Sequence, residues 1–316
     1  MASNTTFRSE LLDALNPPET PDEVDIVTKG EEQTEDFTRT LLEFTVADGH
    51  RNEAYLLVPH AAETSEEKLP GILAIHQHGG RFYVGKSEPV GLSARSDFFY
   101  AKELCERGYV VLVPDLLCFE SRRPPEFRRE EGTSPAGFDY EKFEAMRYLL
   151  DGSTLQGKYL ADLSVALDVL AGLDNVDAGR LGAIGHSLGG QESIWLSWYD
   201  DRLSAAVSSC GMSRYEAIVR DELTHNFAAY VPGLTALGDI EDILASIAPQ
   251  PMMLTSGAKD RIFPIDAVRA VYDQLGETYA SMGHADRFNG VVFDDAHAYP
   301  PAMREQSYEW LDEHLT

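Results

Sequence analysis

The stretch Leu181-Gly182-Ala183-Ile184-Gly185-His186-Ser187-Leu188-Gly189 decides the fold of this chain, because an apolar run leads directly into a Gly-x-Ser-x-Gly pattern. In such a pattern the serine occupies a tight turn between a strand and a helix, where nothing larger than glycine fits two residues to either side. The turn exposes the Ser187 hydroxyl as a candidate nucleophile. It also aims the backbone N–H of Leu188 at the place where a tetrahedral oxyanion would form. A turn that only connects a strand to a helix has the same pattern, so catalytic partners must be sought elsewhere in the chain.

Strand-like and helix-like segments alternate on both sides of this turn. Alternating apolar residues over 40–46 and 53–59 predict an antiparallel hairpin that opens the sheet. Apolar runs then predict buried strands, and amphipathic segments between them predict helices. The predicted strands are 71–76, 109–115, 181–184, 205–209, 251–257 and 290–293, and the predicted helices are 93–107, 160–173, 265–279 and 301–314. This order predicts an α/β fold with a mostly parallel central sheet and helices on both faces.

Two long stretches, 116–157 and 211–249, interrupt this alternation. Both leave from the carboxyl ends of predicted strands, which is where ligands bind in an open parallel sheet. We therefore expect them to form the walls or lid of a pocket. With 316 residues, the chain is expected to be one domain over 1–316, with an N-terminal extension over about 1–36 and these two lid segments.

Charge and cysteine content argue against several classes of function. The chain has 53 Asp and Glu against 26 Lys and Arg, a formal charge of −27, and such a surface repels nucleic-acid phosphates and anionic lipid. Cys105, Cys118 and Cys210 are too few and too irregularly spaced for a disulfide framework or a zinc site. We expect no nucleic-acid partner, no membrane association, no metal and no cofactor. The oligomeric state stays open, a homo-oligomer included, as does a halophilic origin of the acidity.

Local features bear on location and on the pocket. Residues 1–10 contain Phe7 as their one large apolar side chain after the initiator methionine, which predicts a cytoplasmic protein without a signal peptide. The basic cluster 122–129 has two interpretations, a solvated loop paired with Glu130 and Glu131 or an anion-binding rim. Three aromatic residues are candidates either for the pocket lining or for the core: Trp195, Phe227 and Tyr230.

A serine nucleophile needs an imidazole to accept its proton and a carboxylate to orient that imidazole. In a sheet of this kind, the carboxylate and then the histidine follow the serine, each just past a late strand. Asp260 follows the strand predicted at 251–257, and His297 follows the strand predicted at 290–293. The order and the placement therefore predict a triad of Ser187, Asp260 and His297.

Each partner has an alternative interpretation. Asp260 could cap the helix that follows it, and His297 could be a surface residue among the nine histidines of the chain. Asp115, at the end of an earlier predicted strand, is the main alternative carboxylate. Asp294 and Asp295 lie too close to His297 in the sequence to be the expected partner.

The second half of an oxyanion hole is expected from the loop after the strand predicted at 71–76. That loop reads His76-Gln77-His78-Gly79-Gly80-Arg81, and its glycines let backbone N–H groups approach a substrate closely. The N–H of Gly80 is the predicted donor, with that of Arg81 as the second choice. The simpler alternative is a flexible turn whose histidines bind the carbonyl groups of the loop.

These features resemble the α/β-hydrolase superfamily and, more narrowly, its dienelactone hydrolase-like and acetyl xylan esterase-like branch. The resemblance runs from about Pro70 to the C-terminus. It implies an α/β-hydrolase fold with lid-like insertions, the triad Ser187, Asp260 and His297, and an oxyanion hole formed by Gly80 and Leu188. Beyond the serine turn it rests on four stretches: His225-Asn226-Phe227, Val231-Pro232-Gly233-Leu234, Ile247-Ala248-Pro249-Gln250-Pro251 and Lys259-Asp260-Arg261-Ile262-Phe263-Pro264.

The resemblance implies a cofactor-independent serine carboxylesterase that hydrolyses a small-molecule ester through an acyl-enzyme, with sugar acetates among the options. Dienelactone hydrolase itself uses a cysteine where this chain has Ser187, which makes lactone cleavage less expected than ordinary ester hydrolysis. A serine peptidase of the same fold is a further alternative and would need an anchor for the amine or carboxylate of a peptide. A non-catalytic binding protein of this fold usually has an incomplete triad. The sequence does not determine the acyl and alcohol specificity.

Overall fold

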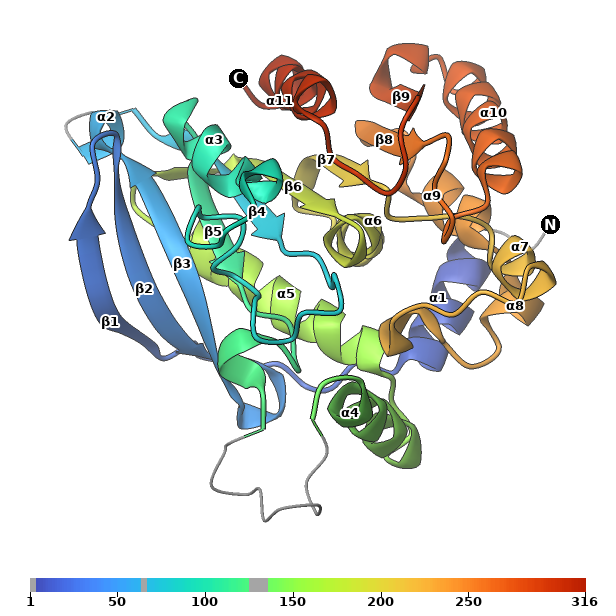
Figure 1. Cartoon of the computed structure of the whole chain (residues 1–316), viewed down its shortest axis with the longest axis horizontal. Helices are drawn as coiled ribbons and strands as arrows, with labels where there is room; N and C mark the ends of the chain where they lie inside the picture. The colour runs from blue at the N-terminus through green and yellow to red at the C-terminus, as the bar shows by residue number, and fades with distance from the viewer. Residues whose placement is uncertain (1–3, 64–66, 125–135) are drawn as a thin grey trace.

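A nine-stranded sheet runs through the molecule with helices packed on both of its faces (Figure 1). The computed structural model describes residues 4–63, 67–124 and 136–316. The strands lie in the order β1-β2-β3-β5-β4-β6-β7-β8-β9. The predicted α/β-hydrolase fold is confirmed. The strand bounds are β1 Ile26–Gln33, β2 Phe37–Thr45, β3 Arg51–Pro59, β4 Leu69–Ile75, β5 Val110–Pro114, β6 Val176–His186, β7 Leu203–Ser209, β8 Met252–Gly257 and β9 Phe288–Phe293.

The sheet is antiparallel at one end and parallel over the rest. β1, β2, β3 and β5 pair antiparallel, whereas β5, β4, β6, β7, β8 and β9 pair parallel. The predicted hairpin is present as β2 and β3, with Leu41 opposite Tyr55. It does not open the sheet, because β1 precedes it and pairs with β2 from within the segment expected as an N-terminal extension. All eight residues of β1 are exposed, so no apolar pattern marks this strand.

Helices follow most of the strands, as predicted. The helix predicted over 93–107 is wrong in its first half, because only Tyr100–Glu106 forms α3. The first half contains only a short 3-10 helix, η2 Ser96–Phe98, and the carbonyl of Asp97 in it accepts a hydrogen bond from the guanidinium of Arg304 at 3.1 Å. The other helix bounds are α1 Asn4–Leu15, α2 His60–Glu63, α4 Phe138–Leu150, α5 Leu155–Ala171, α6 Leu188–Tyr199, α7 Tyr215–Arg220, α8 Leu234–Leu237, α9 Ile240–Ile247, α10 Ile265–Ser281 and α11 Pro301–Leu315.

Two hydrophobic clusters cover the two faces of the sheet. One contains side chains of α5, α6 and α10, and the other contains side chains of α3 and α11. Successive residues of a strand enter alternate clusters, so Leu112 lies in the first and Val111 in the second. Burial on both faces explains why the central strands are continuous apolar runs. Trp195 in α6 is fully buried and belongs to the first cluster rather than to a pocket.

The two interrupting stretches lie beyond the carboxyl ends of the parallel strands. The stretch 116–157 contributes α4, and 211–249 contributes α7, α8, α9 and the short 3-10 helix η5, Phe227–Ala229. α4 packs against both α5 and η5, so the two stretches contact each other (Figure 1). In the described part of the chain, no helix has both the length and the apolar character that crossing a membrane requires.

Candidate active site

A strained turn between β6 and α6 holds Ser187. Its backbone has φ 57° and ψ −118°, outside the usual regions for a residue other than glycine. A Cβ on Gly185 would lie 2.2 Å from the backbone of Gly189, and one on Gly189 would lie 1.9 Å from the carbonyl oxygen of Ile75. The two glycines therefore allow α6 to begin directly against β6 and β4. This packing fixes the position of the Ser187 hydroxyl at the carboxyl ends of the strands.

Hydrogen bonds link the three residues of the predicted triad. Nε2 of His297 lies 2.8 Å from Oγ of Ser187, and Nδ1 lies 2.7 Å from Oδ2 of Asp260. The other carboxylate oxygen of Asp260 accepts the N–H of Ile262 at 3.0 Å. The Asp260 side chain is only 1% exposed, so this carboxylate is held in one orientation behind the ring. The structure thus brings together residues that are 110 and 37 positions apart in the chain.

Close packing of two loops brings Asp260 and His297 together. β8 ends at Gly257, and a Cβ there would lie 2.0 Å from the carbonyl oxygen of Ala296. The absence of a side chain at Gly257 lets the loop after β9 lie directly against the end of β8. The N–H of Lys259 also donates to the carbonyl of Asp295 at 2.8 Å, which ties the two loops together.

The alternative carboxylates have other partners. Asp115 is buried and binds the ammonium group of Lys86 at 2.8 Å. Asp294 pairs with Lys259 at the surface, where its side chain is 86% exposed. Asp295 accepts the N–H of the next residue. Asp260 is therefore the carboxylate that is bonded to the His297 ring.

His297 lies against two rings that the sequence did not assign to the site. The ring centroids of His186 and Phe263 lie 4.9 and 5.8 Å from that of His297. His186 is fully buried, and burial holds its pKa well below the ordinary value, so it packs as a neutral ring. It is the variable residue before the serine in the five-residue pattern, which gives no information about where its side chain points.

Two histidines shape the loop after β4. His76 is buried; its Nδ1 donates to the carbonyl of Gln77 at 2.9 Å, and its Nε2 accepts the N–H of Leu116 at 3.0 Å. Burial lowers the pKa of His76, which suits this neutral arrangement. Nε2 of His78 lies 3.0 Å from the buried carboxylate of Glu141 in α4. Both histidines therefore support the loop, and His78 connects it to the first interrupting stretch.

The predicted oxyanion donors are only partly available in this structure. The N–H of Gly80 donates to Nδ1 of His78 at 3.0 Å, and the N–H of Arg81 donates to the carbonyl of His78 at 3.1 Å. Both N–H groups are thus used within the loop, so the first and second choices are not free to bind an oxyanion here. Leu188, at the first position of α6, lines the same cavity as Ser187 and Gly80.

A cavity of about 310 Å³ opens over Ser187 and His297. Phe138 from α4 and Thr224, His225 and Asn226 from the second interrupting stretch line one side of it. Among the described residues, no Asp, Glu, Lys or Arg side chain lines this cavity. Its full lining is Gln77, His78, Gly79, Gly80, Phe138, Ser187, Leu188, Gln191, Thr224, His225, Asn226, Ile262, Phe263 and His297.

A buried network of hydrogen bonds lies behind Gln191 and Asn226, two residues of the cavity wall. The amide of Asn226 donates to Oε1 of Gln191 at 3.1 Å, and the amide of Gln191 donates to Glu192 at 3.0 Å. Gln156 in α5 donates to the other oxygen of Glu192 at 2.6 Å. Burial raises the pKa of Glu192 to about 8, so this carboxyl group is mostly protonated at neutral pH. Gln156, Gln191 and Glu192 lie in helices without any motif for such a network, so sequence reasoning missed them, whereas Asn226 belongs to one of the stretches that carry the resemblance.

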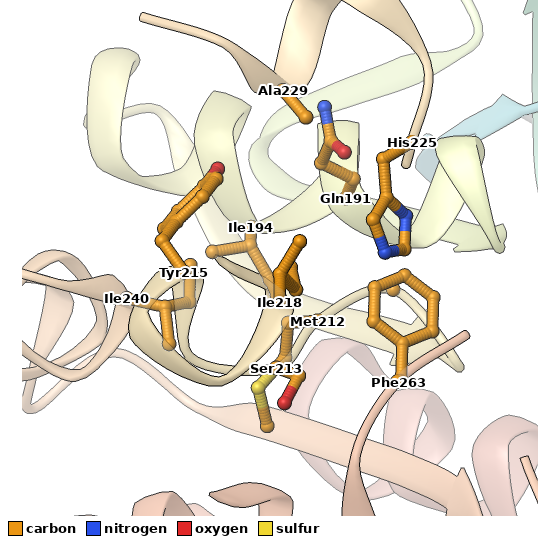
Figure 2. Close-up of a pocket in the computed structure, with 11 residues that line it drawn as sticks. Gln191, Ile194, Met212, Ser213, Tyr215, Ile218, His225, Ala229, Ile240 and Phe263 are labelled. Carbon is orange, nitrogen blue, oxygen red and sulfur yellow. The ribbon is translucent and has the colours of Figure 1, made fainter. Parts of the chain in front are cut away.

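His225 lies where the cavity meets a much smaller one of about 10 Å³ (Figure 2). Its ring packs against that of Phe263 with centroids 4.6 Å apart and the planes tilted by 33°, and its Nε2 donates to the carbonyl of Ile262 at 2.8 Å. Figure 2 shows Gln191 near His225, with the ring of Phe263 on the other side of the His225 ring. The small cavity is at the limit for a single water molecule, so it is not a substrate site.

The basic cluster is not a single surface feature. Arg122 is buried and binds Asp162 at 2.6 Å, so the predicted solvated loop paired with acidic neighbours is wrong for this residue. The side chain of Arg123 donates to the carbonyl of Glu120. Residues 125–135, which include the rest of the cluster with Glu130 and Glu131, lie outside the described residues.

One group of potential metal ligands occurs within the described ranges: Cys210, Asp260 and His297, with ligand atoms within 4.8 Å of one another. The Cys210 thiol donates to the carbonyl of Ala298 at 3.5 Å, and burial raises its pKa to about 12, which disfavours the thiolate that a metal needs. A metal would also have to break the bond between Asp260 and His297. The donor set therefore fits a resident metal poorly.

Known proteins share both the sequence pattern and the fold of this chain. The chain is 29% identical over 289 residues to a Bacillus subtilis protein named "Putative hydrolase YtaP", with 90% of each sequence covered. Its fold is similar to that of a glucuronoyl esterase from Solibacter usitatus, with a TM-score of 0.71, 15% identity, and 100% and 93% of the two chains covered. An acetyl xylan esterase from Thermoanaerobacterium has a TM-score of 0.64 at 15% identity, with 100% and 94% covered.

The family is established by the sequence itself. The sequence model of the dienelactone hydrolase family matches residues 53–308, which is well over half of the chain and includes Ser187, Asp260 and His297. The resemblance predicted from the serine turn and the later stretches is thereby confirmed. This chain belongs to the dienelactone hydrolase family and is a carboxylic ester hydrolase.

Proposed function

We propose that this protein is a serine carboxylesterase that hydrolyses small acyl esters, sugar acetates among them, through an acyl-enzyme. The observation that carries the proposal is the chain of hydrogen bonds from Ser187 through His297 to Asp260. A carboxylate behind an imidazole and a serine hydroxyl in front of it form the arrangement that makes a serine nucleophilic at neutral pH.

The proposed mechanism gives each atom a role that agrees with this geometry. Nδ1–H of His297 donates to Asp260, which leaves Nε2 unprotonated and able to accept the Ser187 proton at 2.8 Å. The serine oxygen attacks the ester carbonyl carbon while Nε2 takes its proton, and the imidazolium then returns this proton to the departing alcohol oxygen. Water, deprotonated by the same Nε2, attacks the acyl-enzyme and releases the acid and free Ser187.

The developing oxyanion needs two N–H donors in this scheme. Leu188 supplies one from the start of α6, next to Ser187. The second comes from the loop after β4, which lines the same cavity. The N–H of Gly80 can serve as this second donor only when its bond to His78 is broken.

The lining of the cavity supports an ester over a peptide substrate. A peptidase that reads a chain end needs a fixed charge to bind the peptide amine or carboxylate. The side chains described around this cavity include no Asp, Glu, Lys or Arg that could supply one. A comparison of acyl esters with peptide amides as substrates tests this point directly.

Replacement of Ser187 by alanine tests the proposed function. The S187A variant should lose p-nitrophenyl acetate hydrolysis and labelling by a fluorophosphonate probe, while its circular dichroism spectrum and melting temperature stay close to those of the wild type. Turnover or labelling at the wild-type level in the folded variant would contradict the assignment. The matched control is Ser204→Ala. Ser204 lies near the start of β7, at the end of the strand away from Ser187, and its hydroxyl donates to the carbonyl of Gly179.

A further inference from the structure

A second cavity of about 390 Å³ adjoins the candidate active site. Thr224 and His225 line both cavities, so the two spaces are neighbours that share one wall. The second cavity is lined by side chains of α4, the start of α5 and the segment that contains η5: Ala145, Met146, Leu149, Thr154, Leu155, Thr224, His225, Phe227 and Tyr230.

Most side chains that line this second cavity are apolar, and most of the polar atoms among them already form hydrogen bonds within the protein. The hydroxyl of Thr154 donates to the carbonyl of Leu15, and Nε2 of His225 donates to Ile262. The phenol oxygen of Tyr230 accepts the N–H of His225 at 3.1 Å. The cavity therefore offers a ligand mainly hydrocarbon and ring surfaces.

Several apolar side chains that line the second cavity are partly exposed. Met146 is 47% exposed and Leu149 is 41% exposed, and both line the second cavity. Tyr230, on the opposite wall, is 47% exposed. Apolar side chains left in water next to a reactive serine indicate a surface that becomes buried when substrate binds.

We infer that this second cavity binds an apolar group of the ester substrate whose carbonyl carbon lies at Ser187. The inference rests on the proposed function and narrows its substrate class. Thr224 and His225 line both cavities, so an ester held at Ser187 needs to extend only past these two residues to place an apolar group in the second cavity. About 13 methylene-sized groups fit into 390 Å³, if each takes about the 30 Å³ that a water molecule occupies.

The junction between the cavities is fixed before substrate arrives. The His225 ring is held by Phe263 on one face and by the carbonyl of Ile262 at its edge, and its backbone N–H is held by Tyr230. Such fixed groups need little reorganisation on binding, so burial of the apolar group adds directly to affinity. An ester of a purely polar sugar leaves this surface exposed to water.

Two series of esters test the inference on the wild-type enzyme, below the concentration at which the substrates aggregate. One series lengthens the acyl chain from p-nitrophenyl acetate to p-nitrophenyl decanoate, and the other lengthens the alcohol from ethyl acetate to octyl acetate. We expect kcat/KM to rise by up to about fourfold per methylene in one series until the cavity is filled. The series that responds identifies whether the acyl group or the alcohol enters the cavity.

A pair of neighbouring substitutions on α4 assigns the effect to this cavity. Leu149→Glu places a charge on the cavity wall, whereas Leu150→Glu places one on the next residue, which is 88% exposed and does not line the cavity. L149E should lower the ratio of kcat/KM for the longest responsive ester to that for acetate by about tenfold or more. L150E should keep this ratio at its wild-type value.

The outcomes separate the two proposals. If kcat/KM is independent of length in both series while acetate is still hydrolysed in a Ser187-dependent way, the apolar site is refuted and the esterase proposal stands. A length dependence that is equally lost in L149E and L150E also refutes the site. If the wild type hydrolyses no ester in either series, the proposed function itself fails.

Discussion

The side of the cavity that carries Ser187 and the side formed by the two interrupting stretches are built in different ways. Ser187, Asp260 and His297 lie at strand ends where glycines allow backbone to pack on backbone, as at Gly189 and Gly257. The opposite side consists of helical segments whose apolar side chains are partly exposed. Under the proposed function, the strand ends hold the reacting groups in place, and we expect the interrupting stretches to select the ester.

The largest effect is expected when the orienting carboxylate is neutralised. Asp260→Asn should lower kcat by about 10⁴-fold with p-nitrophenyl acetate, because the amide no longer holds His297 with Nε2 free to accept a proton. Initial rates of the purified variant give this value. Asp294→Asn, at an exposed neighbour that pairs with Lys259, is the control and should keep wild-type activity. A loss in D260N of less than tenfold would assign the site to another carboxylate.

The next effect tests the backbone packing on the serine side. Gly189→Ala should lower the free energy of unfolding by about 3 kcal/mol or more, because its Cβ would lie 1.9 Å from the carbonyl oxygen of Ile75. Urea unfolding measures the change. Gly276→Ala in α10 is the matched control and should stabilise by about 0.5–1 kcal/mol, since nothing lies within 4 Å of its added Cβ. Equal stability of the two variants would show that the close packing is not required.

A pH-dependent change in stability is expected from Glu192, in the buried hydrogen-bond network behind the cavity wall. The pKa of Glu192 rises from an ordinary 4.5 to about 8 in the folded protein, so the folded state holds more protons than the unfolded chain between these values. Wild-type stability should therefore fall as pH rises through this window, by about 1.4 kcal/mol per unit at most. Glu192→Gln has no titrating group here and lacks this pH dependence. The melting temperature of the variant minus that of the wild type should therefore increase from pH 5 to pH 8 and stay constant above pH 8. A constant difference across this range would mean that Glu192 is ionised in the fold.

The smallest effect on activity is expected from Glu141, which links the interrupting stretches to the loop after β4 on the Ser187 side of the cavity. Glu141 in α4 accepts hydrogen bonds from His78 and from the N–H of Phe227. Glu141→Gln keeps the size of the side chain but cannot accept from both donors, and should lower kcat/KM about fivefold by loosening the loop after β4. Esterase kinetics with Lys142→Gln, at the exposed neighbour, as control measure this. An unchanged E141Q would show that the interrupting stretch does not support the serine side.

The sequence predicted the sheet well where burial leaves a pattern. β4, β5 and β6 are buried on both faces, and their continuous apolar runs marked them as central strands. β1 was missed because it is polar and exposed along its whole length. α4 was missed because its apolar side chains do not form one buried stripe, and several of them are exposed. Elements that gain their order from neighbours distant in the sequence leave no such local pattern.

Within the candidate site, too, features that follow from local sequence were predicted, and features that depend on distant contacts were not. The positions of Ser187, Asp260 and His297 follow from their places after strands, so sequence order was sufficient to nominate them. The state of the Gly80 N–H depends on the orientation of the His78 ring, which is held by Glu141 from 63 residues away. No motif encodes such a contact. The neutral His186 beside His297 and the Glu192 network escaped prediction for the same reason.

The exposed strand β1 bears on whether two copies of this protein pair through the edges of their sheets. It forms one edge of the sheet and pairs on one side only, with β2. Lys29, Glu31 and Glu32 place three charges along it. Charged side chains on an open edge oppose the docking of a foreign strand. We therefore expect this edge of the sheet to resist pairing with a strand of a second copy.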